Sequence, residues 1–337
     1  MSGSSTRSLR FTIASAVVFT AAACADSGAP ITAPSPGVTA SRSPELNSRH
    51  LFHTRQFYAA NAASRVRTSG TGISYHGGPL ITSPATTKVA AIYWGASQVY
   101  PNAPTPGTAG SSAGDGSLIG HFLRNLGGSP YFNINTSYTA SSSATSAKVA
   151  NSVTYTQYWA NASVPNSAPT DADMANMLAN GFANGALTYD ANTVYTIFTG
   201  PNVNLGGGFI TQYCAYHTHA TVTVNGVSRV VLYAAMPHNA DNLSACSGGY
   251  KSPNNDVAAD AEVNTLAHEI EETTTDELGT AWYDNRGYEN ADKCAWTFGK
   301  TYGTANGGTA NMSLGGKDFL VQQNWINAGS GGCALSY

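Results

Sequence analysis

The chain has 337 residues, a formal net charge of −3 and only 10% charged residues. Lys and Arg number 16 against 19 Asp and Glu, so we expect no polybasic surface for nucleic acid or anionic lipid. The charge balance therefore argues against a nucleic-acid partner. The low charge instead agrees with an exported protein.

The N-terminus has the order of a secretory leader. Arg7 and Arg10 precede an apolar run over residues 11–23, which is too short to span a bilayer and ends in small residues. We predict a signal peptide over residues 1–25. Cys24 follows alanines, as in the acylation box of bacterial lipoproteins, and is a candidate lipid anchor; ordinary cleavage beside it is the alternative. The expected location is secreted or lipid-anchored at the cell envelope.

The next segment lacks the pattern of a folded domain. Residues 26–78 are rich in Ser, Pro and Ala and show no apolar periodicity, which predicts a disordered linker. Residues 79–337 are predicted to form the folded domain. It opens with a buried strand over 88–94, where an apolar run lies between Pro84 and Gly95.

Helices and further strands follow in chain order. Spacings of four predict a helix over 117–126, and a capping box at Thr170 to Asp173 predicts the start of a second helix. A buried strand is predicted over 192–200. Asn225-Gly226 between two β-rich runs predicts a hairpin with a primed turn.

The last predicted helix covers 256–275, and the chain beyond it reads as loops and short strands. The elements predict an α/β fold with a mixed, largely antiparallel sheet packed by helices. Because this helix follows a sheet-forming hairpin, the predicted layout is similar to that of zincins. The C-terminal part is expected to be loop-rich and held by a disulfide.

Four cysteines remain after the leader, and an even number in an exported protein favours disulfides. Pairing neighbours along the chain closes two local loops, which predicts the bonds Cys214–Cys246 and Cys294–Cys333. A zinc site built on cysteine is the competing interpretation, but the sequence contains no Cys-x-x-Cys spacing.

The strongest candidate for chemistry is a His-Glu-x-x-Glu sequence in the last predicted helix. His268, Glu272 and Asp276 are spaced by four and share one helical face. In the His-Glu-x-x-His helix of zinc metallopeptidases, side chains at this spacing bind the metal. We predict the metal ligands His268, Glu272, Asp276 and Glu289, and Asp292 is a further candidate.

Glu269 follows the first histidine, in the position of the general base of such a site. The predicted cofactor is a divalent metal, with zinc as the first choice and calcium as the alternative, since a carboxylate-rich set also suits Ca²⁺ or Mn²⁺. The competing interpretation is an ordinary solvated helix face without a metal. His217 and His219 face the same side of a predicted strand and are a second candidate, as ligands or proton carriers; we favour the interpretation of a structural pair near a disulfide.

With these residues in view, the chain resembles the exordium, or phosphate-induced, family of secreted proteins, which is known from plant cell walls and has bacterial relatives. The resemblance covers residues 88–337. Its motifs, in order, are Tyr93-Trp94-Gly95, Tyr195 to Gly200, Phe209 to His217, Ser244-Ala245-Cys246, His268-Glu269 with Glu272, Thr275-Asp276, Ala281-Trp282-Tyr283, Glu289 with Asp292 and Cys294, and Gln323 to Cys333. It implies an extracellular protein, a bacterial member of a family that is linked to growth and cell-wall responses in plants, with residues 79–337 as the exordium-like domain.

Two functions are predicted. The first is a metal-dependent hydrolase, with peptidases included, that acts as a monomer on an extracellular substrate or cell-wall component. The second is a non-catalytic extracellular protein that binds cell wall or polysaccharide and holds a structural metal. Its binding surface would use the tryptophans, because aromatic faces stack well on apolar surfaces. They are Trp94, Trp159, Trp282, Trp296 and Trp325.

Overall fold

The computed structural model describes Met1 and residues 49–61 and 72–337. The predicted signal peptide beyond Met1, Cys24 and much of the predicted linker lie outside the described residues. No helix in the described part of the chain is long and apolar enough to cross a bilayer.

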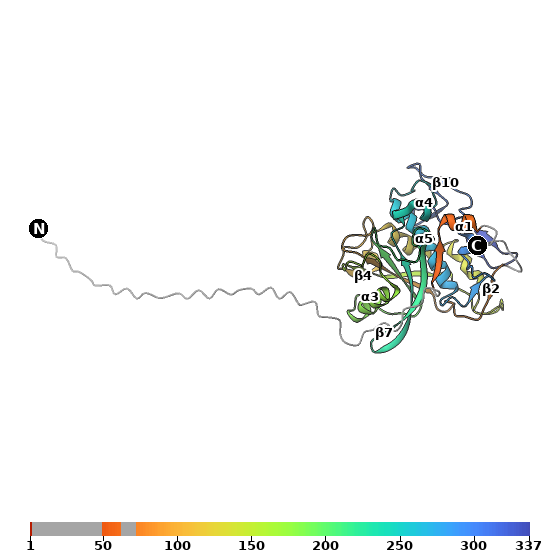
Figure 1. Ribbon diagram of the computed structural model, residues 1–337, viewed down its shortest axis with the longest axis horizontal. Coiled ribbons are helices and arrows are strands. Elements are labelled where there is room, and N and C mark those ends of the chain that lie inside the picture. Colours follow the sequence, from red (N-terminus) through yellow and green to blue (C-terminus); the bar gives the residue numbers. More distant parts are fainter. Residues whose placement is uncertain (2–48, 62–71) are drawn as a thin grey trace. The chain divides into compact units, whose positions relative to one another are not determined.

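A seven-stranded mixed sheet forms the centre of the fold (Figure 1). In spatial order its strands are β1 (His50–His53), β7 (Tyr213–Val224), β8 (Val227–Met236), β6 (Thr193–Thr199), β3 (Thr87–Trp94), β5 (Val153–Asn161) and β4 (Ala109–Ser111). The neighbours β8, β6, β3 and β5 run parallel, whereas β1, β7 and β4 pair antiparallel with their neighbours. The mixed sheet is confirmed. Three of its six strand pairings are parallel and three are antiparallel, so this sheet is not largely antiparallel. The connections from β3 to β5 and from β5 to β6 contain the helices α2 and α3.

Helices cover both faces of this sheet. The helices are α1 (Arg55–Ala60), α2 (Leu118–Leu126), α3 (Asp171–Ala183), α4 (Leu243–Cys246) and α5 (Val257–Thr275), with 3-10 turns η3 (Ser112–Gly114), η4 (Phe132–Ser137), η5 (Asn239–Asn242) and η6 (Asp292–Cys294). On β3, Val89 and Ala91 pack with α2 and α5, whereas Ala90 and Ile92 pack with α3. Burial on both faces explains the continuous apolar run of this strand.

The predicted helix starts are confirmed by their caps. The Ser117 hydroxyl accepts a hydrogen bond from Gly120 N at the start of α2. Thr170 and Asp173 form a reciprocal capping box at the start of α3, and Asp256 caps α5. These caps fix where α2, α3 and α5 begin against the sheet.

The predicted hairpin is also present. Asn225 and Gly226 have φ values of 51° and 77°, as the turn between β7 and β8 requires. The other edge of β7 pairs antiparallel with β1, so that His50 lies opposite His217. Strand β1 and helix α1 fall inside the segment that the sequence assigns to the linker. Residues 50–60 therefore form regular structure, because Phe52 and Tyr58 are buried against the domain.

The C-terminal part consists of loops and two-stranded pairs, as predicted. The pairs are β10 (Tyr302–Gly303) with β11 (Thr309–Ala310), β12 (Met312–Leu314) with β13 (Lys317–Phe319), and β14 (Asn324–Ile326) with β15 (Gly332–Ala334); β9 (Trp282–Tyr283) pairs with β2 (Ser74–Tyr75). Both predicted disulfides, Cys214–Cys246 and Cys294–Cys333, are present. They are compatible with an extracellular protein.

Helix α5 is buried on nearly all sides, and burial of its residue Glu262 is expected to make the stability of the protein depend on pH. Burial raises the pKa of this carboxyl from 4.5 to about 8. The folded state therefore binds the proton more tightly than the unfolded state, and this group makes the protein less stable as pH rises between these values. In the wild type, this carboxyl should lower the free energy of unfolding by up to about 1.4 kcal/mol for each pH unit in this range. We expect Glu262→Gln to lack this decrease.

The measurement is urea unfolding of the wild type and of Glu262→Gln between pH 5 and pH 8. Groups common to both proteins cancel in the difference between their unfolding free energies. That difference should grow in favour of the variant as pH rises. A difference that stays constant across this range would contradict the prediction.

Candidate metal centre

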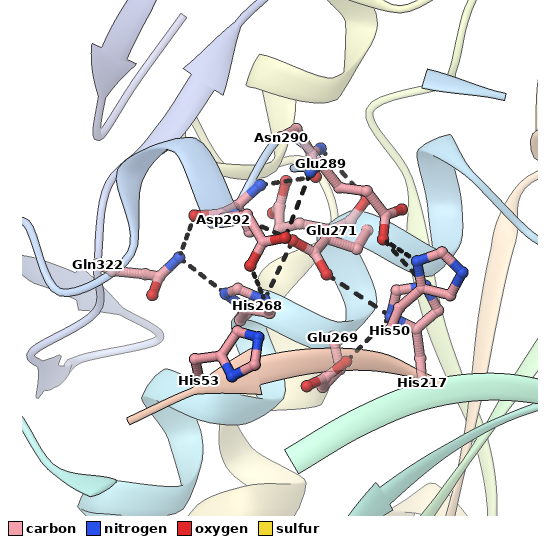
Figure 2. A network of polar contacts seen from close by, with 12 residues as sticks. His50, His53, His217, His268, Glu269, Glu271, Glu289, Asn290, Asp292 and Gln322 are labelled. Carbon is pink, nitrogen blue, oxygen red and sulfur yellow. Dashed lines mark hydrogen bonds and ion pairs between the residues drawn. The ribbon is translucent and has the colours of Figure 1, made fainter. Parts of the chain in front are cut away.

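Four parts of the chain meet at a buried polar cluster at the edge of the sheet (Figure 2). Helix α5 contributes His268, Glu269 and Glu272, and β7 contributes His217. The loop after β9 contributes Glu289 and Asp292, and β1 adds His50. Figure 2 shows the His50 and His217 rings together on one side and His268 on the other.

The helical spacing brings the first two predicted ligands together. His268 Nε2 lies 3.1 Å from Glu272 Oε1, one turn further along α5. Both side chains are buried, at 0% and 1% exposure, so the solvated-face interpretation is wrong. Asp292 completes this set, since its Oδ1 lies 3.6 Å from His268 Nε2.

The donor atoms have the separations that a metal centre needs. The described residues form three sets, each with one ligand atom per residue and all atoms within 4.8 Å. They are His268 with Glu272 and Asp292, His217 with Glu269 and Glu272, and His50 with His217 and Glu289. Ligands about 2.0–2.1 Å from a tetrahedral Zn²⁺ lie about 3.3 Å apart, close to the separations in the first set.

Several donor atoms at the centre have no hydrogen-bond partner among the described residues. They are His217 Nε2, His268 Nε2, Glu269 Oε1, Glu272 Oε2 and both carboxylate oxygens of Glu289. A buried polar atom without a partner costs about 1–3 kcal/mol, and more when it is charged. A divalent cation satisfies such atoms together, so the donor set fits a metal ion.

The electrostatics lead to the same conclusion. Burial raises the pKa of Glu272 to about 8 and that of Asp292 to about 7. Burial, and then the neighbouring carboxylates, raise the pKa of Glu269 and Glu289 well above the usual range. Burial also lowers the pKa of His268 to about 4, which keeps the imidazole in its neutral, ligand form. Binding of a cation would displace protons from these carboxyl groups.

Surrounding groups hold the ligands in place. The Gln322 carboxamide nitrogen lies 3.0 Å from His268 Nδ1 and donates to the Ala291 carbonyl at 2.9 Å. The Tyr58 hydroxyl donates to Asp292 Oδ1, and Asp292 N donates to Glu272 Oε1 at 2.9 Å. A cation at Nε2 would put the His268 ring proton on Nδ1. The carboxamide would accept that proton only with its oxygen turned towards the ring, which would end its hydrogen bonds with the Ala291 carbonyl and Trp296 N.

Asp276, the remaining predicted ligand, is placed differently. It is the C-terminal cap residue of α5, and its Oδ1 accepts hydrogen bonds from Thr280 N at 2.6 Å and Ala281 N at 2.8 Å. It belongs to none of the three donor sets found among the described residues. The helix ends at Thr275, so the spacing of four no longer carries this side chain onto the ligand face.

Two histidines are central although the sequence did not assign them. His217 was interpreted as structural, yet it is buried and takes part in two donor sets. His219, two residues on, is part of none of the described sets. His50 lies in the segment predicted as linker. The residues His50, Leu51, Phe52 and His53 do not alternate between polar and apolar, so they are a weak strand signal, and nothing local identifies β7 as the partner.

A family described as "phosphate-induced protein 1 conserved region" matches residues 127–319, more than half of the chain. The matched region contains His217, α5 and the Glu289–Asp292 loop, whereas His50 and Gln322 lie outside it. No curated protein and no solved structure matches the chain. The order of motifs and the family match agree, and the chain belongs to the phosphate-induced protein 1 family.

Proposed function

We propose that this protein is an exported, metal-dependent hydrolase, with peptide bonds among its candidate substrates. The observation that carries the proposal is the position of Glu269. Its Oε2 lies 3.0 Å from His217 Nδ1, and its Oε1 has no hydrogen-bond partner in the described part of the chain. A buried carboxylate with one oxygen held and one available, beside a cation-binding set, has the arrangement of a general base.

His268, Glu272 and Asp292 would hold the cation, which supplies Lewis-acid chemistry when bound. One imidazole and two carboxylates suit Zn²⁺, and the carboxylate share keeps Ca²⁺ as the alternative. Glu269 would take the proton of the attacking water through Oε1. His217 would keep Glu269 in place through Oε2 and would stabilise the carboxylate before it receives the proton.

The first test is cation binding, measured by calorimetry on protein treated with a chelator and titrated with ZnCl₂ or CaCl₂. We expect Glu272→Gln to weaken binding strongly, because Glu272 takes part in two of the three donor sets. In the wild type, a free cation concentration of 100 times the Kd should raise the free energy of unfolding by about 2.7 kcal/mol.

Glu271→Gln is the matched control. Glu271 is the preceding residue of the same helix and is equally buried, but its side chain accepts a hydrogen bond from Asn324 and lies outside the donor sets of the described residues. The control should bind cation as the wild type does. Equal binding by both variants, or no binding by the folded wild type, would contradict the proposed centre.

The burial of the centre favours a second candidate, an extracellular protein with a structural cation and no catalysis. The side chains of the first donor set are at most 11% exposed. Retained fold and cation with no hydrolysis of any tested peptide would support it.

The tryptophan surface predicted for this candidate is not supported. Four of the five tryptophans are buried, and Trp296 stacks on Phe52. The four are Trp94, Trp159, Trp282 and Trp325.

A further inference from the structure

The segment 49–61 places three side chains on the proposed centre. Strand β1 brings His50 to Glu289, with His50 Nδ1 2.7 Å from Glu289 Oε2. The Phe52 ring lies against His268, with 4.0 Å between the ring centroids. The Tyr58 hydroxyl donates to Asp292. One short stretch of chain therefore covers both ends of the cluster.

The His50 end has its own set of donor atoms. His217 Nε2 lies 3.7 Å from Glu289 Oε2, the same oxygen that faces His50. The two imidazoles stack with 4.9 Å between centroids. These distances bring two ring nitrogens and one carboxylate around a single point. The set is separate from the one formed by His268 and Asp292.

The atoms of this second set are not satisfied by one another. Among the described residues, His217 Nε2 and both Glu289 oxygens have no hydrogen-bond partner, although both side chains are 1% exposed. The close contact of His50 with Glu289 therefore lacks the geometry of a hydrogen bond. The neighbouring Lys293 ammonium cannot neutralise Glu289, since it pairs with Asp284 at 2.8 Å. A cation bound by all three residues would give these buried polar atoms a partner.

The backbone beside His50 is shaped to admit its ring. Gly279, in the turn after α5, has φ of 68°, and a Cβ at this position would overlap the His50 imidazole. A side chain at residue 279 would thus push His50 away from Glu289. Because Gly279 has no side chain, the His50 imidazole can lie close to the other two donors, Glu289 and His217.

We propose that His50, His217 and Glu289 bind a second divalent cation, which ties segment 49–61 across the proposed catalytic centre. Two imidazoles and one carboxylate favour zinc over calcium. The statement that segment 49–61 lies across a catalytic centre depends on the proposed function, because it treats the first cation as catalytic. Since one donor comes from β1 and two from the body of the domain, binding of this cation and docking of β1 favour each other.

The experiment measures zinc per chain by elemental analysis of the full chain, after equilibration with excess ZnCl₂ and removal of unbound metal. The wild type should hold two zinc ions. His50→Ala and Glu289→Gln should each hold one. The matched control is His53→Ala, since His53 lies on the same strand and stacks on Phe57 but belongs to no donor set of the described residues. It should hold two.

The outcomes separate this inference from the proposed function. One zinc in the wild type and one in His50→Ala would overturn the second site and leave the first intact. No zinc in any folded protein would overturn the proposed function as well. Equal loss in His53→Ala and His50→Ala would show that strand docking, and not ligation by His50, holds the ion, and would also overturn the assignment. Circular dichroism of each variant establishes that it is folded.

Discussion

Replacing Glu269 by glutamine is expected to lower hydrolytic turnover by about 10²–10⁴-fold, the usual contribution of a general base. Glutamine has nearly the same shape and can still contact His217, but it cannot accept the proton of the attacking water. Cation binding should change little, because His268, Glu272 and Asp292 remain. Turnover is measured by mass spectrometry on a library of unstructured peptides, at equal zinc content per chain.

Glu271→Gln controls for the loss of a buried carboxyl from the same helix. Glu271 faces Asn324 and not the donor atoms, so this variant should retain wild-type turnover. If Glu269→Gln cleaved the library as fast as the wild type did, Glu269 would not be the base. A turnover loss accompanied by zinc loss would instead place Glu269 among the ligands, in agreement with its donor set with His217 and Glu272.

The parts of this site that the sequence predicts are those set by local geometry. His268 and Glu272 converge because residues one helical turn apart share a face, and the limits of α5 follow from its cap at Asp256. The same rule also predicts Asp276 on this face, but the rule holds only while the helix continues, and Asp276 is in none of the donor sets of the described residues. Glu289 and Asp292 come from a loop, and their order in the chain shows only that carboxylates follow the helix.

The parts that the sequence does not predict depend on pairing between distant segments. His50 reaches the cluster because β1 pairs with β7, and no pattern in residues 50–53 identifies that partner. The parallel centre of the sheet has the same origin, since strand order follows from the crossovers and not from any single strand. Composition assigned residues 50–60 to a linker because a four-residue strand and a short helix leave little periodicity.

This pairing also gives the first disulfide a role near the centre. Cys214 lies on β7 three residues before His217, and Cys246 ends α4. The buried sulfurs pack in one cluster with Phe52 and Tyr58. The bond therefore fixes the part of β7 that pairs with β1, together with the aromatic groups that cover His268 and Asp292.

Replacing both Cys214 and Cys246 by alanine is expected to lower the free energy of unfolding by about 3.7 kcal/mol, because the unfolded chain regains the freedom of the loop that this bond closes. The sequence separations of the two bonds are 32 and 39 residues, so the Cys294→Ala/Cys333→Ala variant should lose a similar amount, about 3.9 kcal/mol. Urea unfolding at saturating zinc measures both.

The pair of variants separates two effects of the bond. If confinement of the unfolded chain dominates, the two losses agree within about 0.5 kcal/mol, because the loop entropy grows slowly with length. If Cys214–Cys246 also positions β1 over the centre, its variant loses more and in addition binds zinc more weakly. A loss below about 1 kcal/mol in both variants would mean that neither bond confines the unfolded chain, and the disulfides would then have little part in holding the centre together.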